Sequence, residues 1–387
     1  MNSCHSCAVK TKHHSWMSGT LAKGCQLCVK GEKLVLFITG LCGQKCFYCP
    51  VSERKFGSDV VFANEWKISN PDNPVELLEE ARLTRATGAG ITGGDPLVKV
   101  GRCCHYIKLL KRTFGKSFHT HLYTPLMLVN EENIKRLYEA GLDEIRFHPD
   151  LDDKKWWHRI ELARKYKWDV GIEIPAIPDY EEKTRTLIDF IADKVMFINL
   201  NELEISDTQA AHYKMDPKKF VSKDSLSYGV KGSQEMALKM VNYAHEKNLS
   251  AHFCTAKLKD SVQVGERLKR RAKSIALPDE TITEDGTIIR GCIYLKDTVP
   301  SFGYRKRLNE TNKKPIIEKL NYVMQELVKN KIFKRDEIRI DEIKIRLITS
   351  EKNVQKSARK IKELNLVPAI IEEYPTADAL EIDVQFV

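Results

Sequence analysis

The sequence has no long hydrophobic run, no low-complexity tract and no internal repeat. Its longest strongly apolar stretch lies around residues 34–38, far below the roughly 18 consecutive apolar residues that a membrane-spanning helix needs. The first residues, MNSCHSC, also lack the apolar core of a secretory signal peptide. We therefore expect a cytoplasmic protein that has no membrane partner.

The charge balance excludes little. Lysine and arginine number 63 against 53 aspartate and glutamate, which gives a net charge of +10. A Lys-rich surface accounts for this excess, and attraction to a phosphate-bearing partner such as RNA is the alternative. The length of 387 residues and the 42% hydrophobic content predict a large core domain with one or two smaller ones.

Cysteine is unevenly distributed. Seven of the 11 cysteines fall within the first 49 residues, at short spacings. In a cytosolic chain, clustered cysteines favour metal ligation over disulfides. Four of them form two CxxC pairs, a pattern typical of tetrahedral zinc, although such a site also accepts iron and a second iron–sulfur cluster is the alternative. We predict that residues 1–30 form a zinc-ribbon-like knot, neither helix nor sheet, held by Cys4, Cys7, Cys25 and Cys28.

The middle of the chain alternates between strand-like and helix-like segments. Helical patterns of 10–15 residues separate the strand-like runs, an alternation that predicts βα units and a parallel sheet. We predict an α/β fold, a partial (β/α)6-type TIM barrel over residues 31–258, in which chemistry lies at the carboxyl ends of the strands. The strand-like runs are 32–39, 88–92, 117–123, 143–148, 169–174, 195–200 and 250–254.

The last third of the chain changes in character. Residues 259–313 are predicted to be a basic connecting segment, with a basic helix around residues 266–273 and a hairpin turn at Glu284–Gly286. Residues 314–387 are predicted to form a small α+β domain, with strands at 337–348, 367–373 and 380–387 and a helix at 353–364.

Three further cysteines follow the first strand of the predicted barrel. Cys42, Cys46 and Cys49 have C-x3-C-x2-C spacing. Each thiolate can bind one iron of a [4Fe–4S] cube, which leaves the fourth iron without a protein ligand. An open metal position of this kind is typical of a catalytic site, where a small molecule completes the coordination.

This loop, with the aromatic Tyr48 just before its third cysteine, resembles the radical S-adenosylmethionine (SAM) superfamily. The resemblance implies that SAM chelates the open iron and is cleaved reductively to a 5′-deoxyadenosyl radical, which abstracts a hydrogen atom from the substrate. It covers roughly residues 31–258. Within the superfamily, the chain looks most like the branch related to activating enzymes of pyruvate formate-lyase.

Two further segments support the resemblance. Gly93-Gly94-Asp95-Pro96 resembles the GGE-P motif that holds the SAM amino group, although Asp95 is shorter than Glu and backbone carbonyls are the alternative contact. Residues 171–176 resemble the fifth strand, which lies against adenine, and an inward Glu173 needs a partner such as the SAM ribose. The SAM contacts implied are Tyr48, Gly93, Gly94, Asp95, Thr124, Glu173, Pro175 and Asn199.

Position at strand ends marks Arg146, His148 and Glu202 as candidate catalytic residues on the substrate side. His148 is equally compatible with a structural role. A radical SAM enzyme needs a reductant such as ferredoxin or flavodoxin. Its substrate is a small molecule, a protein or, as the basic helix suggests, tRNA or another RNA. A non-enzymatic iron–sulfur or zinc-binding protein is the remaining alternative.

Overall fold

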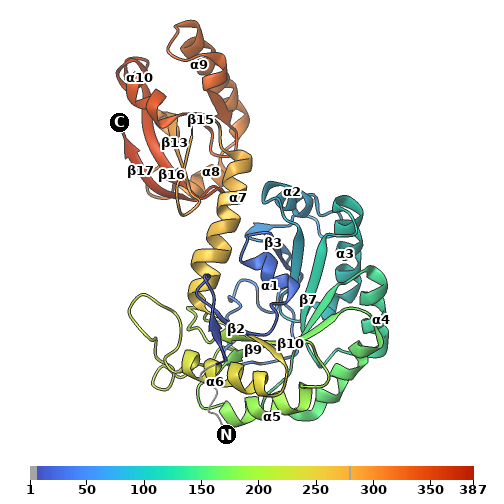
Figure 1. The fold of residues 1–387 in the computed structure, drawn as a ribbon. Helices are drawn as coiled ribbons and strands as arrows, with labels where there is room; N and C mark the ends of the chain where they lie inside the picture. The colour runs from blue at the N-terminus through green and yellow to red at the C-terminus, as the bar shows by residue number, and fades with distance from the viewer. Residues whose placement is uncertain (1–6, 279) are drawn as a thin grey trace. The chain divides into compact units, whose positions relative to one another are not determined.

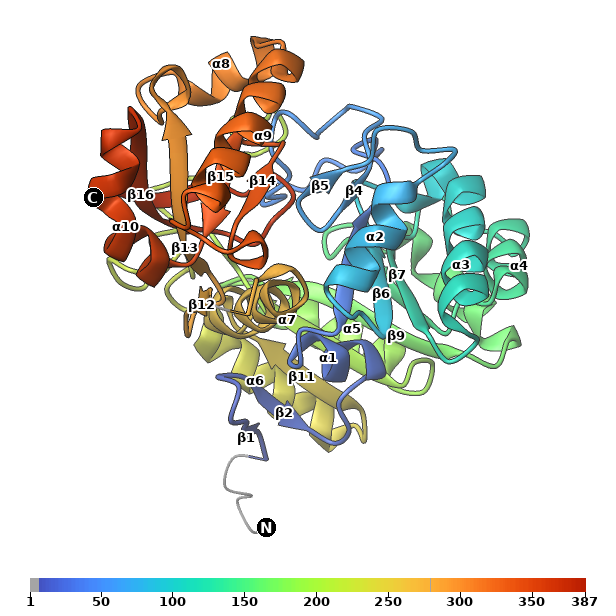
Figure 2. The ribbon, with the colours of Figure 1, turned by 90° about the horizontal axis from the view of Figure 1, so that it is seen from above.

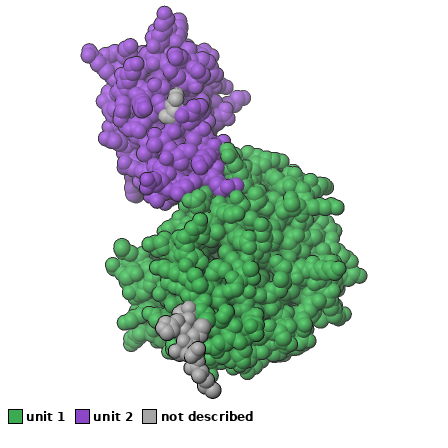
Figure 3. Space-filling model, viewed as in Figure 1, with its two compact units in different colours: residues 1–267 green, residues 268–387 purple. Residues whose placement is uncertain are grey.

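The computed structural model describes residues 7–278 and 280–387. The chain divides into two compact units, residues 1–267 and 268–387 (Figure 3). The boundary lies within helix α7 (Gly265–Ile275), so most of the predicted connecting segment belongs to the second unit. Among the described residues, no helix is both long and apolar enough to cross a membrane.

The first unit is built on a sheet whose central strands run parallel, as the alternating pattern predicts (Figure 1). This confirms the α/β class. Seven parallel strands lie side by side in the order β11 (Ser250–Cys254), β10 (Phe197–Glu202), β9 (Asp169–Ala176), β8 (Glu144–His148), β7 (His119–Pro125), β6 (Gly88–Thr92) and β3 (Lys33–Phe37).

Short antiparallel strands extend both edges of this sheet. β4 (Phe62–Ala63) and β5 (Trp66–Lys67) continue it beyond β3. β2 (Trp16–Ser18) pairs with β11, and β1 (Val9–Lys10) pairs with β2. Within the described residues, the sheet therefore contains 11 strands. The two outermost strands at each edge are antiparallel to their neighbours.

Helices connect the parallel strands and lie along the outside of the sheet (Figures 1 and 2). Each buries one apolar stripe: α4, for example, starts where the Asn130 side chain accepts a hydrogen bond from Asn133 N at 2.9 Å, and buries Ile134, Leu137 and Ala140. The helical segment expected between the strand-like runs 143–148 and 169–174 is a 3₁₀ helix. The connecting helices are η1 (Pro96–Lys99), η2 (Lys154–Lys165), η3 (Leu258–Val264, a π-helix), α2 (Val75–Leu83), α3 (Val100–Phe114), α4 (Glu131–Ala140), α5 (Glu181–Ile191) and α6 (Ser233–Glu246).

The N-terminal segment is where the fold departs most from prediction. Within the described residues it is not a separate knot, because β1 and β2 join the large sheet and α1 (Lys23–Cys28) packs on β3, β6 and β7. We call the face of the sheet toward α1 its inner face. Gly24 makes this approach possible, since a Cβ there would lie 2.6 Å from Arg146 Nη2 and 2.7 Å from His121 Cε1. The helix thereby buries Cys25, Leu27 and Cys28.

The second unit contains an antiparallel sheet. Its central strand is β13 (Ile288–Leu295), which pairs with both β15 and β16 and so places the predicted connecting segment inside the domain. The turn at residues 284–286 joins β12 to β13 as predicted, whereas the predicted strand at 337–348 is two strands. The other elements are β12 (Thr281–Ile282), β14 (Arg339–Asp341), β15 (Arg346–Thr349), β16 (Leu366–Glu373), β17 (Glu381–Phe386), α8 (Tyr304–Glu310), α9 (Lys313–Lys329), α10 (Glu351–Glu363), η4 (Lys296–Thr298) and η5 (Arg335–Glu337).

Candidate functional site

A cavity of about 410 Å³ lies where the loop after β3 meets the carboxyl ends of β6, β7 and β8. Its wall joins the three-cysteine loop to side chains on the inner face of the sheet. The lining residues are Lys33, Val35, Cys42, Gln44, Cys46, Tyr48, Cys49, Pro50, Phe56, Gly90, Thr92, Gly93, Gly94, Tyr123, Thr124, Pro125, Arg146, His148, Glu173 and Asn201.

Cys42, Cys46 and Cys49 all line this cavity as free, half-buried thiols. Gln44 N donates to Cys42 Sγ at 3.4 Å, and Cys49 N donates to the Cys46 carbonyl at 3.1 Å, so the loop has internal order. In the described part of the chain, no three His, Cys, Asp or Glu side chains converge as ligands of a single ion. A cubane does not require this, because each thiolate binds a different iron. Three thiols that share one cavity fit such a cluster.

Burial raises the pKa of Cys42 to about 11 and also raises the pKa of Cys46 and of Cys49. Without a cation the three thiols therefore stay protonated at neutral pH. Binding to iron favours the thiolate form, so loading a cluster releases protons from this loop.

Tyr48 links the cysteine loop to the sheet. Its hydroxyl lies 2.9 Å from His148 Nε2, and it also hydrogen-bonds Cys46. His148 Nδ1 lies 2.8 Å from the Glu173 carbonyl, which only accepts, so Nδ1 carries the ring proton and Nε2 accepts from Tyr48. Burial lowers the pKa of His148, which keeps the ring neutral. The chain of bonds fixes the loop against β8 and β9.

The hydrogen bond between Tyr48 and His148 is expected to stabilise the protein. Tyr48→Phe removes the hydroxyl and leaves a buried ring nitrogen without a donor, which should lower the free energy of unfolding by about 1–3 kcal/mol. A double-mutant cycle with His148→Leu, measured by urea unfolding of anaerobically purified protein, isolates the pair. Strictly additive effects of the two single variants would refute the link.

Gly93 and Gly94 form a shelf on the opposite wall of the cavity. Gly93 has a φ of +154°, and a Cβ on Gly94 would lie 2.5 Å from the Leu41 carbonyl oxygen and 2.9 Å from Cys42 Cβ. A Cβ on Gly93 would likewise lie 2.5 Å from the Thr39 carbonyl oxygen. The two glycines therefore let this segment pack directly against the chain that leads into the cysteine loop, and they contribute no side chain to the cavity that they line.

Asp95 does not line the cavity, although its motif predicts contact with SAM. Its carboxylate is buried, and Oδ1 accepts hydrogen bonds from Leu97 N at 3.0 Å and from the Thr124 hydroxyl at 2.8 Å. Burial raises the pKa of Asp95 to about 6 against the effect of these two bonds. The geometry favours the alternative in which backbone groups of the shelf, and not this carboxylate, face the ligand.

Asp95→Asn should accordingly keep SAM binding. The folded pKa of Asp95 is above its ordinary value of 3.8, so this group stabilises the fold at low pH, and the contribution is lost as the pH rises through about 6. The stability of the Asn variant relative to wild type should therefore increase as the pH rises from about 4 to about 7. Urea unfolding at both pH values tests this, and loss of SAM binding in equilibrium dialysis would return the carboxylate to the site.

Glu173 lines the cavity from β9 and is fully bonded. Its Oε2 accepts from Arg146 Nη1 at 2.7 Å and from Asn199 Nδ2 at 3.1 Å, and its Oε1 accepts from Asn201 Nδ2 at 3.1 Å. Burial acts to raise the pKa of Glu173, but Arg146 and these bonds outweigh it and bring the pKa to about 2. The partners of this inward carboxylate in the structure are therefore protein groups, where we expected a partner such as the SAM ribose.

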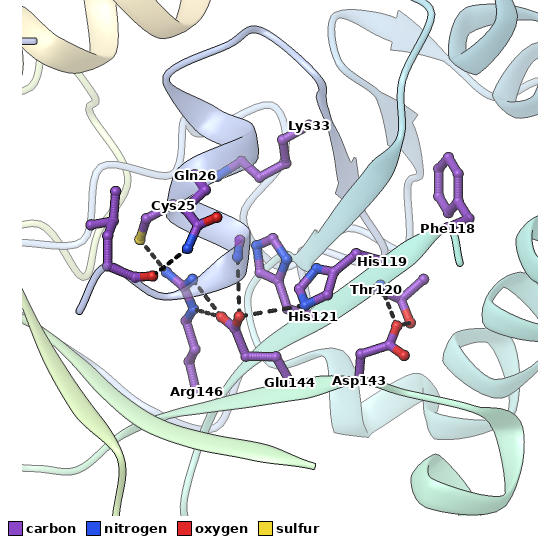
Figure 4. Close-up of polar contacts among 12 residues, drawn as sticks. Cys25, Gln26, Lys33, Phe118, His119, Thr120, His121, Asp143, Glu144 and Arg146 are labelled. Carbon is purple, nitrogen blue, oxygen red and sulfur yellow. Dashed lines mark hydrogen bonds and ion pairs between the residues drawn. The ribbon is translucent and has the colours of Figure 1, made fainter. Parts of the chain in front are cut away.

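Arg146 is the centre of a buried network on the inner face (Figure 4). It forms ion pairs with Glu173 and with Glu144, and its Nη1 lies 3.4 Å from Cys25 Sγ. Glu144 also accepts from Gly24 N at 3.1 Å, which ties α1 to β8. These contacts give Arg146 a structural part in the wall of the cavity.

The remaining predicted residues lie beside the cavity. Pro175 is buried on β9, and Asn199 bonds Glu173 and, at 3.1 Å, Cys25 Sγ. Glu202 is buried and accepts from Lys223 Nζ at 2.6 Å and from Ala256 N at 2.8 Å. The structure thus brings Arg146 and His148, together with Thr124 and Glu173, to the cavity wall with the cysteine loop. It does not bring Glu202, Pro175 or Asn199 there.

Sequence reasoning missed Lys33 and Tyr123, two polar residues of the cavity wall, whereas Asn201 was noted as a polar residue at the end of its strand. Lys33 had a signal: it stands in a strand whose next four residues are all apolar. The strand register places Tyr123 beside Arg146, a neighbour that sequence separation hides.

The predicted zinc ligands are Cys4, Cys7, Cys25 and Cys28, of which the last two share helix α1. Cys4 lies outside the described residues. Cys25 and Cys28 are buried on α1, and the Cys25 thiol faces Arg146 and Asn199. No metal group forms among the described residues, so zinc at the N-terminal cysteines stays a prediction. Elemental analysis of a Cys4→Ser variant tests it: unchanged zinc content would remove the proposal.

The fold and the three-thiol cavity define the class of protein. The sequence profile of the radical SAM superfamily matches residues 36–191, which spans the cysteine loop and the strands from β6 to β9. With the relative described next, this shows that the chain belongs to the radical SAM superfamily and is a radical SAM enzyme.

A similar protein of Methanocaldococcus jannaschii carries the name "Putative glycyl-radical enzyme activating enzyme MJ0021". It is 39% identical over an alignment of 376 positions, which covers 94% of this chain and 92% of that protein. Two solved structures are more distant. HydG, a maturase of the [FeFe]-hydrogenase, matches with a TM-score of 0.38 and 12% identity over 88% of this chain and 82% of its own. TsrM, a methyltransferase from Kitasatospora setae, matches with a TM-score of 0.35 and 13% identity over 47% of this chain and 38% of its own.

Proposed function

We propose that this chain is an activating enzyme that abstracts a hydrogen atom from a glycine of a partner glycyl-radical enzyme. The observation that carries the proposal is the single cavity shared by the three free thiols and the glycine shelf. The name of the relative in Methanocaldococcus jannaschii, matched over 94% of this chain, supports the choice of partner.

The finer description of the fold is part of this proposal. Seven parallel strands with helices outside are compatible with a partial (β/α) barrel, because inner-face side chains of β3, β7, β8 and β10 gather around α1. In such a fold, the open side of the barrel admits a substrate and the carboxyl ends of the strands face it.

The roles of the residues follow from their places. Cys42, Cys46 and Cys49 would hold a [4Fe–4S] cluster, which together with SAM supplies the 5′-deoxyadenosyl radical when both are bound. Gly93 and Gly94 leave backbone groups open to the amino group of SAM. Tyr48 closes the cavity on the side of His148 and restricts water.

A partner reductant such as ferredoxin or flavodoxin would supply the electron. The basic helix supports the alternative RNA substrate less than its sequence suggested, because Arg267 and Arg271 of α7 are both buried. Arg267 pairs with Glu65 at 2.8 Å, and Arg271 donates to the Pro375 carbonyl. Two of the charges that suggested a nucleic-acid surface are thus internal.

The test uses the full chain, reconstituted anaerobically with iron, sulfide and SAM. It is mixed with a glycyl-radical enzyme encoded by the same organism, grown with glycine deuterated at Cα. We expect one deuterium in the 5′-deoxyadenosine produced from this labelled partner, and a glycyl doublet in the EPR spectrum when the partner instead carries unlabelled glycine. SAM cleavage without either signal would reject the glycyl target and keep the radical SAM assignment.

A further inference from the structure

Lys33 stands apart among the charged groups of the cavity. It lies at the start of β3, on the strand that leads into the cysteine loop, and lines the cavity together with Tyr123. The same cavity reaches Cys42, Cys46 and Cys49. A ligand group held at Lys33 would therefore share one space with the reacting centre.

The carboxylates nearby are already committed to another cation. Arg146 pairs with both Glu144 and Glu173, and Glu173 also accepts from two asparagines. No described carboxylate lies within ion-pair distance of Lys33. Its ammonium is thus the cation of the described cavity wall that lacks an acidic partner.

Lys33 has neutral or weakly acidic neighbours instead. Its Nζ lies 3.4 Å from the Tyr123 hydroxyl and 5.9 Å from the centre of that ring, and it hydrogen-bonds Cys28. An ammonium carries three N–H donors, and these two acceptors leave one unused. Burial acts to lower the pKa of Lys33, but Cys28 and Tyr123 raise it by more, so the group is charged at neutral pH.

The Tyr123 hydroxyl is surrounded by nitrogen donors. It lies 3.0 Å from His121 Nε2 and 3.5 Å from Arg146 Nη1, in addition to Lys33 Nζ. Burial lowers the pKa of His121, so that ring is neutral and its Nε2 can accept a hydrogen bond from the hydroxyl. The corner of the cavity formed by Lys33 and Tyr123 therefore carries the charge of the ammonium, with no described carboxylate in contact with it.

We propose that Lys33, supported by Tyr123, binds a carboxylate of the substrate at the inner end of the cavity. This rests on the proposed function in that the substrate enters the cavity where the radical forms. Two sources of the carboxylate fit: an acidic side chain next to the target glycine of a partner protein, or a free small carboxylic acid. The shared chemistry is an ammonium–carboxylate contact in a half-buried corner.

Binding of succinate and of its uncharged diamide, succinamide, tests the proposal by isothermal titration calorimetry on the reconstituted full chain. Wild type should bind succinate at least about tenfold more tightly than succinamide, since hydrogen bonds to charged groups are the strong ones. Lys33→Met should lose this preference, and Lys33→Arg should retain part of it. Because no SAM cleavage is measured, a negative result leaves the proposed function standing.

Three controls make the result specific. Lys30→Met removes an exposed lysine near Lys33 in sequence and should bind like wild type. Tyr123→Phe keeps the ammonium and should weaken succinate less than Lys33→Met does, which covers the case in which the Met variant fails to fold. Cys28→Ser should keep the preference. If the preference survives in Lys33→Met, or disappears in Cys28→Ser, the proposal is wrong.

Two blocked peptides, Ala-Glu-Gly-Ala and Ala-Gln-Gly-Ala, separate the two sources. A preference for the glutamyl peptide that depends on Lys33 supports a protein substrate with an acidic neighbour of its glycine. A Lys33-dependent preference for succinate alone supports a free acid. Equal binding of both peptides together with equal binding of succinate and succinamide would overturn the carboxylate site.

Discussion

Cys42→Ala is expected to abolish reductive cleavage of SAM while the protein stays folded. Cys42 is half-buried at the cavity wall, so truncation removes no core contact of the size that unfolds a domain. With two thiolates the loop no longer supplies three irons with a protein ligand. The measurement is 5′-deoxyadenosine formed with dithionite and SAM, and we expect a loss of at least about 1,000-fold, equivalent to about 4 kcal/mol.

The matched control is Cys104→Ala. Cys104 is also half-buried and free, but it lies on α3, where its thiol donates to the Arg136 carbonyl at 3.5 Å, and it does not line the cavity. This variant should retain wild-type iron content and activity. A Cys42→Ala protein that still produces 5′-deoxyadenosine after anaerobic reconstitution would refute the assignment of the cluster loop.

The parts of the fold that repeat were predictable from the sequence. Each parallel strand carries a run of apolar residues and each connecting helix an apolar stripe, so alternation along the chain gives the strand boundaries to within a few residues. The cysteine loop was equally visible, because its ligands are close in sequence. What these segments share is that local pattern decides their structure.

The N-terminal segment shows where this reasoning fails. Two CxxC pairs suggested a metal-held knot, yet residues 16–18 pair with β11 at positions more than 230 residues away in the chain, and residues 9–10 pair with residues 16–17. The strands are only two and three residues long, too short for periodicity to reveal them. Their partner is a sheet edge that exists only once the rest of the unit has folded.

Only part of the candidate site could be predicted, and the reason is similar. The inward carboxylate of Glu173 was recognisable as a group that needs a partner, but sequence offered no way to choose the partner. Arg146 lies 27 residues earlier, on the neighbouring strand, and sequence position alone marked it as a catalytic candidate. Polar residues on adjacent parallel strands meet only through the register, and the register is set by the whole sheet.

Arg146→Met is expected to destabilise the protein by about 3–5 kcal/mol, because it leaves the carboxylates of Glu144 and Glu173 without their cation. Arg146 is 2% exposed and Glu144 is fully buried, so water cannot take over the role of the guanidinium. Urea unfolding at pH 7 measures the loss. A change below about 1 kcal/mol would contradict the network.

The pH dependence of that loss separates charge from shape. In wild type the pKa of Glu173 is about 2, below its ordinary value of 4.5, so its contribution to stability is present above pH 4.5 and is lost as the pH falls toward 2. In Arg146→Met the attraction is gone and burial raises this pKa, so the variant gains stability as the pH falls. The gap between the two proteins should therefore narrow on acidification, and Arg146→Met/Glu173→Gln should lose much of this dependence. A gap that stays constant with pH would mean that Arg146 acts through packing alone.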